Sequence, residues 1–232
     1  MSILIVVAHP DDEVLGCGAT AAIASASGVA TYACILAGAA NARRQRPDPD
    51  SLLAHTRAAS ARLGMHPPIV GDFPNIELNR VPHLELVQFV EQAMEVTGAH
   101  TVFTHHPADL NDDHLHVSRA AQAAARLSHR RTGIPELRGL YFMEVLSSTD
   151  WVFASTMAPF VPDTFVDIGL EGVDRKISAL EHYAGVIRQP PHSRSEEAIR
   201  ALATLRGAQA NVLRAEAFQT GFARVSFGRS IA

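Results

Sequence analysis

A histidine and three carboxylates follow directly on the first apolar run of the chain. Residues 3–8 read ILIVVA, and after them come His9 and, beyond a proline, Asp11, Asp12 and Glu13. A short, charge-free run rich in β-branched residues is typical of a strand buried on both faces of a parallel sheet. Open α/β folds bind ligands just beyond the carboxyl ends of such strands. We therefore expect a tight turn here, on which metal ligands or catalytic groups can converge.

A second polar cluster follows another strand-like run, residues 101–104. Four histidines, together with several carboxylates, lie in the segment 105–116. If the two strands share one edge of a sheet, His9, Asp12 and His114 would supply two imidazoles and one carboxylate. Three protein ligands with one open position are the usual pattern of a catalytic zinc site. Nitrogen and oxygen ligands without thiolates favour zinc, although Fe(II), Mn or Co could also be bound.

Each cluster taken alone also has a structural interpretation. His105 or His106 could cap the preceding strand by hydrogen bonding to the backbone. The Asp and Asn residues at 109–113 are of types common in loops and at helix N-caps. Two such clusters at the ends of two buried strands, with no lysine nearby, nevertheless favour a metal site.

The elements that must position these residues alternate between strands and helices. This order predicts an α/β fold, a Rossmann-like three-layer sandwich with a mainly parallel sheet. Ser51 is expected to cap the second helix, and Leu84 to face the core from the third. Strands are expected at 3–8, 29–36, 68–72, 101–104 and 140–146, with a final edge strand at 225–227. Helices are expected at 13–28, 51–64, 84–94, 114–128, 174–187 and 195–218.

The composition is that of a soluble globular protein. The chain has 232 residues, 47% apolar and 19% charged, and we expect one domain over residues 1–232. The absence of a long apolar run or signal-like segment predicts a cytoplasmic protein that does not bind membranes. The net charge of −4 gives no support for nucleic-acid binding. Cys17 and Cys34 lie in apolar surroundings and are expected to be buried, reduced thiols.

Four motifs of the chain resemble those of the PIG-L/LmbE-like deacetylases. They read AHPDDExxxGCGAT, THHPxDLNxDH, SSTDW and HSRSxEAIxxLAxxRGxQAN…AEAF, and they extend over nearly the whole sequence. Members of this family are similar in removing acetyl groups from N-acetylglucosamine units with a zinc ion on a Rossmann-like fold. The resemblance implies one Zn²⁺ per chain held by His9, Asp12 and His114, with Asp11 as the general base. Asn111 stands where the best-studied members have a histidine proposed to stabilise the oxyanion.

The chemistry of amide hydrolysis gives the remaining polar residues their expected roles. A bound metal can lower the pKa of water from about 16 to about 7 and polarise the acetyl carbonyl. Asp11 would take the proton of the water and pass it to the departing amine. His106 or Asn111 could donate a hydrogen bond to the oxyanion. Asp113 is expected to orient an imidazole, and Glu13 to support the N-terminus of the helix.

Candidate substrate-binding residues lie on loops. Arg43, Arg44 and Arg46 follow the second predicted strand. They could hold a phosphate or carboxylate of the substrate, or form a solvated basic loop. Trp151 could stack on a sugar ring or pack within its own loop. His192, in a Pro-Pro-His turn, could reach the site or only fix the turn.

The sequence therefore predicts a metal-dependent amidohydrolase with a small-molecule substrate. We expect a zinc-dependent hydrolase that removes an N-acetyl group from an N-acetylated amino sugar or glycoside. An alternative is a metallohydrolase of another amide or carbamoyl substrate, such as an antibiotic or thiol-conjugate intermediate. A third, less favoured, hypothesis is a non-catalytic protein that binds a sugar or nucleotide. The aglycone, the pathway and homo-oligomer formation are left open.

Overall fold

One seven-stranded sheet organises the residues that the computed structural model describes, namely 1–38, 49–153 and 158–225. Its order is β3-β2-β1-β4-β5-β7-β6. The strands β1 to β5 are parallel, whereas β7 runs antiparallel to both of its neighbours, β5 and β6. The mainly parallel α/β fold predicted from the sequence is thus confirmed. The strands are β1 (Ser2–Val7), β2 (Ala30–Ile35), β3 (Ile69–Val70), β4 (Thr101–His105), β5 (Gly139–Met143), β6 (Thr164–Asp167) and β7 (Ala215–Ala223).

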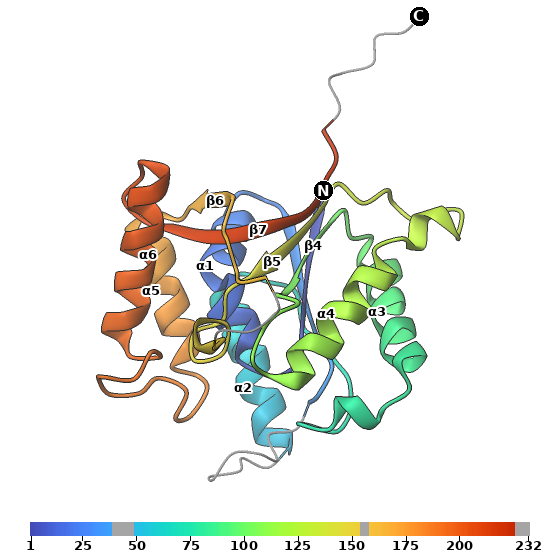
Figure 1. Ribbon diagram of the computed structural model, residues 1–232, viewed down its shortest axis with the longest axis horizontal. Helices are drawn as coiled ribbons and strands as arrows, with labels where there is room; N and C mark the ends of the chain where they lie inside the picture. The colour runs from blue at the N-terminus through green and yellow to red at the C-terminus, as the bar shows by residue number, and fades with distance from the viewer. Residues whose placement is uncertain (39–48, 154–157, 226–232) are drawn as a thin grey trace, which may run out of the picture.

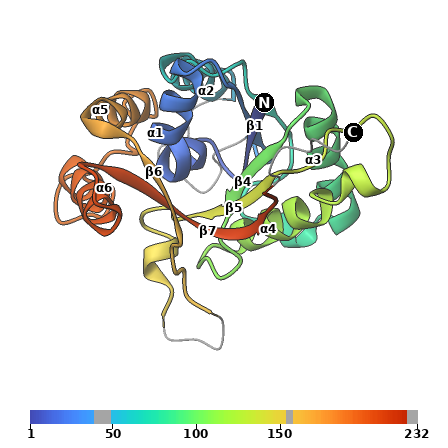
Figure 2. The same cartoon turned by 90° about the horizontal axis from the view of Figure 1, so that it is seen from above.

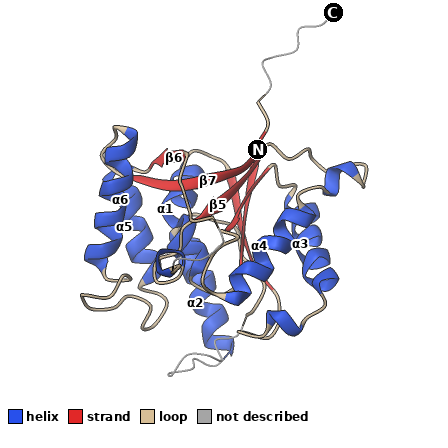
Figure 3. Ribbon diagram, viewed as in Figure 1, coloured by secondary structure: helices blue, strands red, loops and turns tan. Residues whose placement is uncertain are grey.

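Helices cover both faces of the sheet, which gives three layers (Figures 1 and 3). One face carries α1 (Asp12–Ala26), α2 (Pro49–Arg62), α5 (Gly169–Leu180) and α6 (Glu196–Ala210). The other face carries α3 (His83–Thr97) and α4 (Asp112–Ala124). Figure 2 shows the same two groups of helices from above, on opposite sides of the strands. No helix in these described segments is long and apolar enough to cross a membrane.

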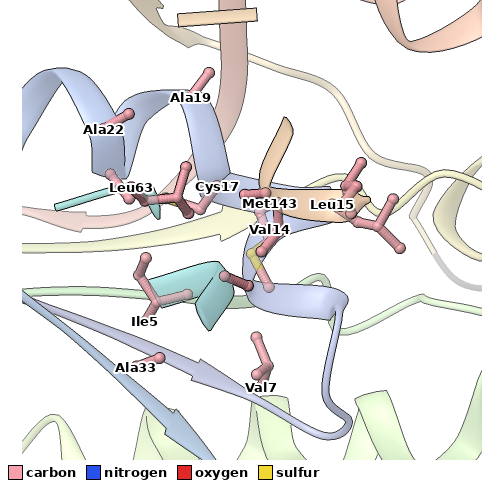
Figure 4. Close-up of a cluster of buried hydrophobic side chains, with 14 of the residues drawn as sticks. Ile5, Val7, Val14, Leu15, Cys17, Ala19, Ala22, Ala33, Leu63 and Met143 are labelled. Carbon is pink, nitrogen blue, oxygen red and sulfur yellow. The ribbon is translucent and has the colours of Figure 1, made fainter. Parts of the chain in front are cut away.

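The two faces of β1 contribute to two separate hydrophobic clusters. Successive side chains of a strand point to opposite faces of the sheet. Leu4 and Val6 accordingly pack in the cluster with α3 and α4. Ile5 and Val7 pack in the cluster with α1, α2 and α5, part of which is shown in Figure 4. Burial on both faces explains why this strand consists of one continuous apolar run.

The direction of the chain across the sheet reverses between β1 and β4. From β1 the chain proceeds outward through β2 to β3, and it then returns to place β4 on the other side of β1. The register pairs Val6 with Thr104, so the carboxyl ends of the two strands lie side by side. Such a switch point leaves a crevice beyond the strand ends, because the flanking loops leave in opposite directions. Both polar clusters found in the sequence follow these two strand ends.

The last part of the chain differs from the sequence prediction. The helix expected over 195–218 ends at Ala210, where Asn211 adopts a left-handed conformation with φ 58°. The following residues form β7, which lies between β5 and β6 and not at an edge of the sheet. Ala and Glu favour helix locally, but pairing with two strands outweighs that preference. The edge strand expected at 225–227 is therefore wrong at Val225, and the rest of it lies outside the described residues.

Smaller differences concern the starts of helices. The helix α2 begins at Pro49, so Ser51 lies inside it and not at its N-cap. Proline is suited to the first helical turn, where its missing N–H removes no hydrogen bond.

The structure also shows how exposed individual side chains are. Leu84 is 64% exposed and does not face the core. Cys17 and Cys34 are free and buried.

Candidate metal and catalytic site

The three predicted metal ligands meet at the switch point of the sheet. His9 follows β1, Asp12 begins α1, and His114 lies in the first turn of α4. One ligand atom from each lies within 4.8 Å of the others. The Oδ2 atom of Asp12 is 3.2 Å from Nδ1 of His9 and 3.1 Å from Nε2 of His114. All three side chains are buried, so the fold concentrates these donor atoms away from bulk water.

The His114 ring shows that this group fits a divalent cation. Its Nε2 atom is buried and forms no hydrogen bond, although it lies close to the Asp12 carboxylate. Two imidazole nitrogens and one carboxylate oxygen form a donor set that suits zinc and other divalent transition metals. A cation bound between these atoms would give the otherwise unused nitrogen a partner.

A carboxylate behind each imidazole fixes the orientation of the ring. The Oδ2 atom of Asp113 is 2.8 Å from Nε2 of His9, which leaves Nδ1 facing Asp12. Backbone N–H groups of Ile76 and Leu78 donate to the same carboxylate at 2.6 and 3.0 Å. Such outer partners set the tautomer and direction of metal-binding histidines.

Asp109 performs the corresponding function for His114. Its Oδ1 atom is 3.1 Å from Nδ1 of His114. The hydroxyl of Thr149 donates to Asp109 Oδ2 at 2.6 Å, and the hydroxyl of Ser148 donates to Oδ1. The sequence motifs DLNxDH and SSTDW therefore meet behind the imidazole.

The ionisation of the cluster reflects its concentrated negative charge. Burial by itself would lower the pKa of His114, but the neighbouring carboxylates of Asp12 and Asp109 raise it to about 10. Burial would likewise raise the pKa of Asp12, yet His114 holds it well below its usual range. For Asp109, His114 outweighs burial and lowers the pKa to about 2. The pocket thus stabilises a positive charge at the position that a cation would take.

Asp11 lies beside the ligands but has a different environment. Its backbone is left-handed, with φ 110°, and its N–H donates to Oε2 of Glu13 at 3.0 Å. Its Oδ2 atom is 3.6 Å from Nη1 of Arg194, whose Nε donates to the hydroxyl of Ser147 at 2.5 Å. The carboxylate of Asp11 thus lies near a guanidinium, while that of Asp12 faces the two imidazoles.

The two expected oxyanion donors already make other hydrogen bonds. Nδ1 of His106 accepts from the N–H of Ala108 at 3.2 Å, and its Nε2 lies 3.1 Å from Oε1 of Gln219. The side-chain oxygen of Asn111 accepts from the N–H of Asp113 at 3.0 Å and caps α4. Both nitrogens of His106 thus have protein partners, whereas the amide NH₂ of Asn111 is not used by this cap.

His105 joins the two strand ends. The N–H of Ala8 donates to its Nε2 atom at 2.9 Å, so the ring proton lies on Nδ1. That Nδ1 atom is buried without a hydrogen-bond partner. The ring stacks on His114, with centroids 3.7 Å apart. Burial lowers the pKa of His105 to about 3. His105 thus forms a hydrogen bond with the backbone, which is the structural role that the sequence offered as the alternative to metal binding.

The structure describes only two of the expected substrate-binding residues, Trp151 and His192. Arg43, Arg44 and Arg46 lie outside the described residues. Trp151 is 54% exposed and lies edge-on to Phe153, with centroids 6.3 Å apart. The exposed side chain of His192 accepts from the N–H of Arg194 through Nδ1, at 3.0 Å, within its own turn.

Three polar residues at the site received no role from the sequence. Asp109 and Arg194 lie inside recognisable motifs. Neighbouring charged residues could equally have been assigned a role at the site, so the sequence does not single these two out. Tyr183 donates its hydroxyl proton to Glu13 Oε1 at 2.5 Å, and no local pattern marks it. Glu13, expected to support the N-terminus of α1, lies in its first turn and is fully buried, where it accepts from Tyr183 and from the N–H of the N-cap residue Asp11.

Comparisons with known proteins give a family match and several similar solved structures. The family model PIG-L, described as GlcNAc-PI de-N-acetylase, matches residues 4–125. The conserved protein TT1542 from Thermus thermophilus is 26% identical, with a TM-score of 0.78 and 99% coverage of both chains. GalB, the 4-carboxy-2-hydroxymuconate hydratase of Pseudomonas putida, is 23% identical, with a TM-score of 0.75 and the same coverage. N,N'-diacetylchitobiose deacetylase from Pyrococcus horikoshii is 16% identical, with a TM-score of 0.75, over 94% of this chain and 83% of the other. No curated protein matches the chain.

Proposed function

Because the chain belongs to the PIG-L family of hydrolytic de-N-acetylases, we propose that it removes the acetyl group from a small N-acetylated amino sugar or glycoside with the help of one bound Zn²⁺. The observation that carries this proposal is the buried group of His9, Asp12 and His114, with the carboxylate of Asp11 at its side. This family membership also makes a non-catalytic binding protein the weakest of the three hypotheses.

The protein residues around the metal position have distinct tasks in this proposal. Nδ1 of His9, the carboxylate of Asp12 and Nε2 of His114 would hold the ion, which would supply Lewis-acid activation of the acetyl carbonyl and of water. Asp11 would accept a proton from the attacking water. It would return the proton to the amide nitrogen as the C–N bond breaks, because an unprotonated amine is a poor leaving group.

Two further residues complete the proposed mechanism. Asp113 would keep His9 in the ligating orientation through the contact of 2.8 Å to its Nε2 atom. Asn111 is the better candidate than His106 for a hydrogen bond to the oxyanion. Its NH₂ group is not used by the helix cap, whereas both nitrogens of His106 have partners in the protein.

The variant Asp11→Asn tests the proposed base. It keeps the size of the side chain but cannot accept a proton, so we expect kcat/KM to fall by roughly 10²- to 10⁴-fold. The metal content should stay at one ion per chain. Release of acetate would be measured over free, nucleotide-linked, lipid-linked and inositol-linked N-acetylglucosamine. Asp174→Asn is the matched control, since Asp174 pairs with Arg200 in an exposed surface contact.

Two results would count against the proposal. Full activity of Asp11→Asn would remove Asp11 from the mechanism. Absence of acetate from every member of the panel, with metal-loaded wild-type protein, would contradict N-deacetylation of these sugars. Extending the panel to other amides and carbamoyl compounds, read by loss of mass, would then test the alternative hydrolase.

Hydration is a second candidate reaction, and the likeness to GalB favours it. That hydratase matches this chain over 99% of both lengths, at higher identity than the chitobiose deacetylase. The same base and metal position could deliver water to a polarised C=C bond, and Arg194 could bind a substrate carboxylate. Incubation with 4-carboxy-2-hydroxymuconate would show a loss of conjugated ultraviolet absorbance if this reaction occurs, and constant absorbance if it does not.

A further inference from the structure

The backbone of Asp11 is held in a conformation that an aspartate seldom adopts. Its φ of 110° and ψ of −28° lie in the region normally reserved for glycine. A non-glycine residue of this kind is strained and persists only where the surrounding structure enforces it. Because Asp11 immediately precedes the ligand Asp12, the groups that enforce its conformation also determine the direction of the proposed base.

Hydrogen bonds fix the peptide groups on both sides of Asp11. Its carbonyl oxygen accepts from the N–H groups of Val14 and Leu15 at 3.1 and 2.8 Å, which anchors it to the first turn of α1. Its own N–H donates to Oε2 of Glu13 at 3.0 Å. The carbonyl bonds are ordinary helix contacts, whereas the N–H bond depends entirely on where the Glu13 carboxylate lies.

Tyr183 determines the place of that carboxylate. Its hydroxyl donates to Oε1 of Glu13 at 2.5 Å. Glu13 is 0% exposed and Tyr183 is 1% exposed, so water cannot substitute for either partner. The ring of Tyr183 is packed in the hydrophobic cluster of α1, α2 and α5, which leaves its hydroxyl a single position. Each oxygen of Glu13 thus has one donor, and the side chain bridges Tyr183 and the catalytic turn.

We propose that Glu13 and Tyr183 are positioning residues that hold Asp11 in its left-handed conformation and thereby aim its carboxylate. Neither residue touches the substrate in this arrangement. Tyr183 lies just beyond α5, outside the segment 4–125 that the family model matches. The later part of the chain therefore contributes to the turn after β1 through a buried side chain. The effect on rate rests on the proposed role of Asp11, whereas the effect on the backbone does not.

The first experiment removes only the hydroxyl of Tyr183. Tyr183→Phe keeps the ring in its cluster but leaves Oε1 of Glu13 without its donor. We expect faster hydrogen exchange in the peptide covering residues 8–15, measured by mass spectrometry. We also expect kcat to fall about 10- to 100-fold with KM within twofold, because small misplacements of a reacting group have effects of this size. Tyr32→Phe is the control, since Tyr32 stacks on His66 away from the site.

The second experiment separates positioning from charge. In Glu13→Gln the amide oxygen can accept from the N–H of Asp11, and the NH₂ can donate to the Tyr183 oxygen. We therefore expect Glu13→Gln to keep most of the activity and the slow exchange. Glu13→Leu fills a similar volume without either bond and should lose both. Equal losses in Glu13→Gln and Glu13→Leu would show that the charge of Glu13 matters, and would overturn the proposal.

The two readouts also distinguish this inference from the proposed function. Unchanged exchange of the 8–15 peptide in both Tyr183→Phe and Glu13→Leu would overturn the positioning role, whatever the substrate is. Faster exchange with unchanged kcat would overturn the effect of this contact on the base. If the wild-type protein releases no acetate, N-deacetylation fails, while the exchange experiment still decides whether Tyr183 and Glu13 hold the turn.

Discussion

The two nitrogens of the His114 ring face different partners, and this division makes the residue a suitable ligand. Nδ1 lies 3.1 Å from a carboxylate oxygen of Asp109, whereas Nε2 faces Asp12. A proton held on Nδ1 by Asp109 leaves the Nε2 lone pair directed at the cation position. The hydroxyls of Ser148 and Thr149 fix Asp109 in turn. The His114 ring is therefore oriented by a chain of contacts that begins on another loop.

Loss of the Asp109 charge should weaken metal binding. We expect Asp109→Asn to reduce zinc affinity by about 10- to 100-fold, since outer carboxylates of histidine ligands typically have effects of this size. Competition with a chromophoric chelator measures the change. Asp112→Asn, an exposed neighbour at the start of α4, is the control and should bind zinc as the wild type does. Wild-type affinity in Asp109→Asn would show that His114 needs no such partner.

The sequence predicted site residues only where they occur in a dense local pattern. His9, Asp12 and His114 lie in polar clusters that follow apolar runs, and the structure brings them together. Tyr183 is 170 residues from its partner Glu13. A single tyrosine in a segment predicted to be helical gives no sign of such a contact. Long-range pairing of this kind is determined by packing and not by local spacing.

At the scale of elements, the N-terminus of α4 places the second cluster. Asn111 precedes the helix with extended backbone, and its side-chain oxygen accepts from the N–H of Asp113. This cap is the reason that the helix begins at Asp112, two residues earlier than the sequence predicted. His114 then falls in the first turn, facing the end of β1.

Substitutions at Asn111 should separate capping from catalysis. Asn111→Ala removes the cap and should lower the free energy of unfolding by about 1 kcal/mol, whereas Asn111→Ser can restore the bond. Urea denaturation of the metal-free proteins measures both. If the amide also donates to the oxyanion, Asn111→Ser should be as stable as wild type but slower in kcat. Equal stability of the Ala, Ser and wild-type proteins would contradict the capping role.

The sequence predicted the parallel strands better than the antiparallel ones. Strands β1 and β4 are buried on both faces, so a continuous apolar run marks β1 and a run without Asp, Glu, Lys or Arg marks β4. In β7 the segment Ala215–Phe218 reads AEAF, whose Ala and Glu residues favour helix, and Glu216 is buried through contacts to other elements. Asparagine is common in the left-handed conformation at the end of a helix, and Asn211 adopts it here. Its place in the sequence was therefore the local signal from which an earlier helix end could have been predicted.

At the scale of the whole molecule, one buried ion pair links three elements. Nζ of Lys176 on α5 donates to Glu216 of β7 at 2.7 Å and to the carbonyl of Leu15 at 2.6 Å. Glu216 also accepts from the N–H groups of Ala19 and Thr20 in α1, at 3.1 and 2.6 Å. The two charged side chains are 9% and 7% exposed. Every charge at this junction thus has partners, as a buried pair requires.

Removing one member of this pair should destabilise the fold. Lys176→Met leaves Glu216 buried with only its two backbone donors, and we expect a loss of about 3 kcal/mol in the free energy of unfolding. The double variant Lys176→Met/Glu216→Gln should recover part of that loss, because no uncompensated charge remains. Chemical denaturation of both proteins measures the difference. A double variant less stable than Lys176→Met would contradict this explanation.

The position of β7 between β5 and β6 has a consequence for the order in which a newly made chain can fold. During synthesis, β1 to β5 leave the ribosome before β7, so the outer edge of β5 has no partner until residues 215–223 appear. An unpaired strand edge invites association with other chains. Lys176 also lacks Glu216, its carboxylate partner, until that moment. The nascent protein therefore carries an open sheet edge from the completion of β5 at Met143 until β7 appears, and β7 both closes that edge and completes the buried ion pair.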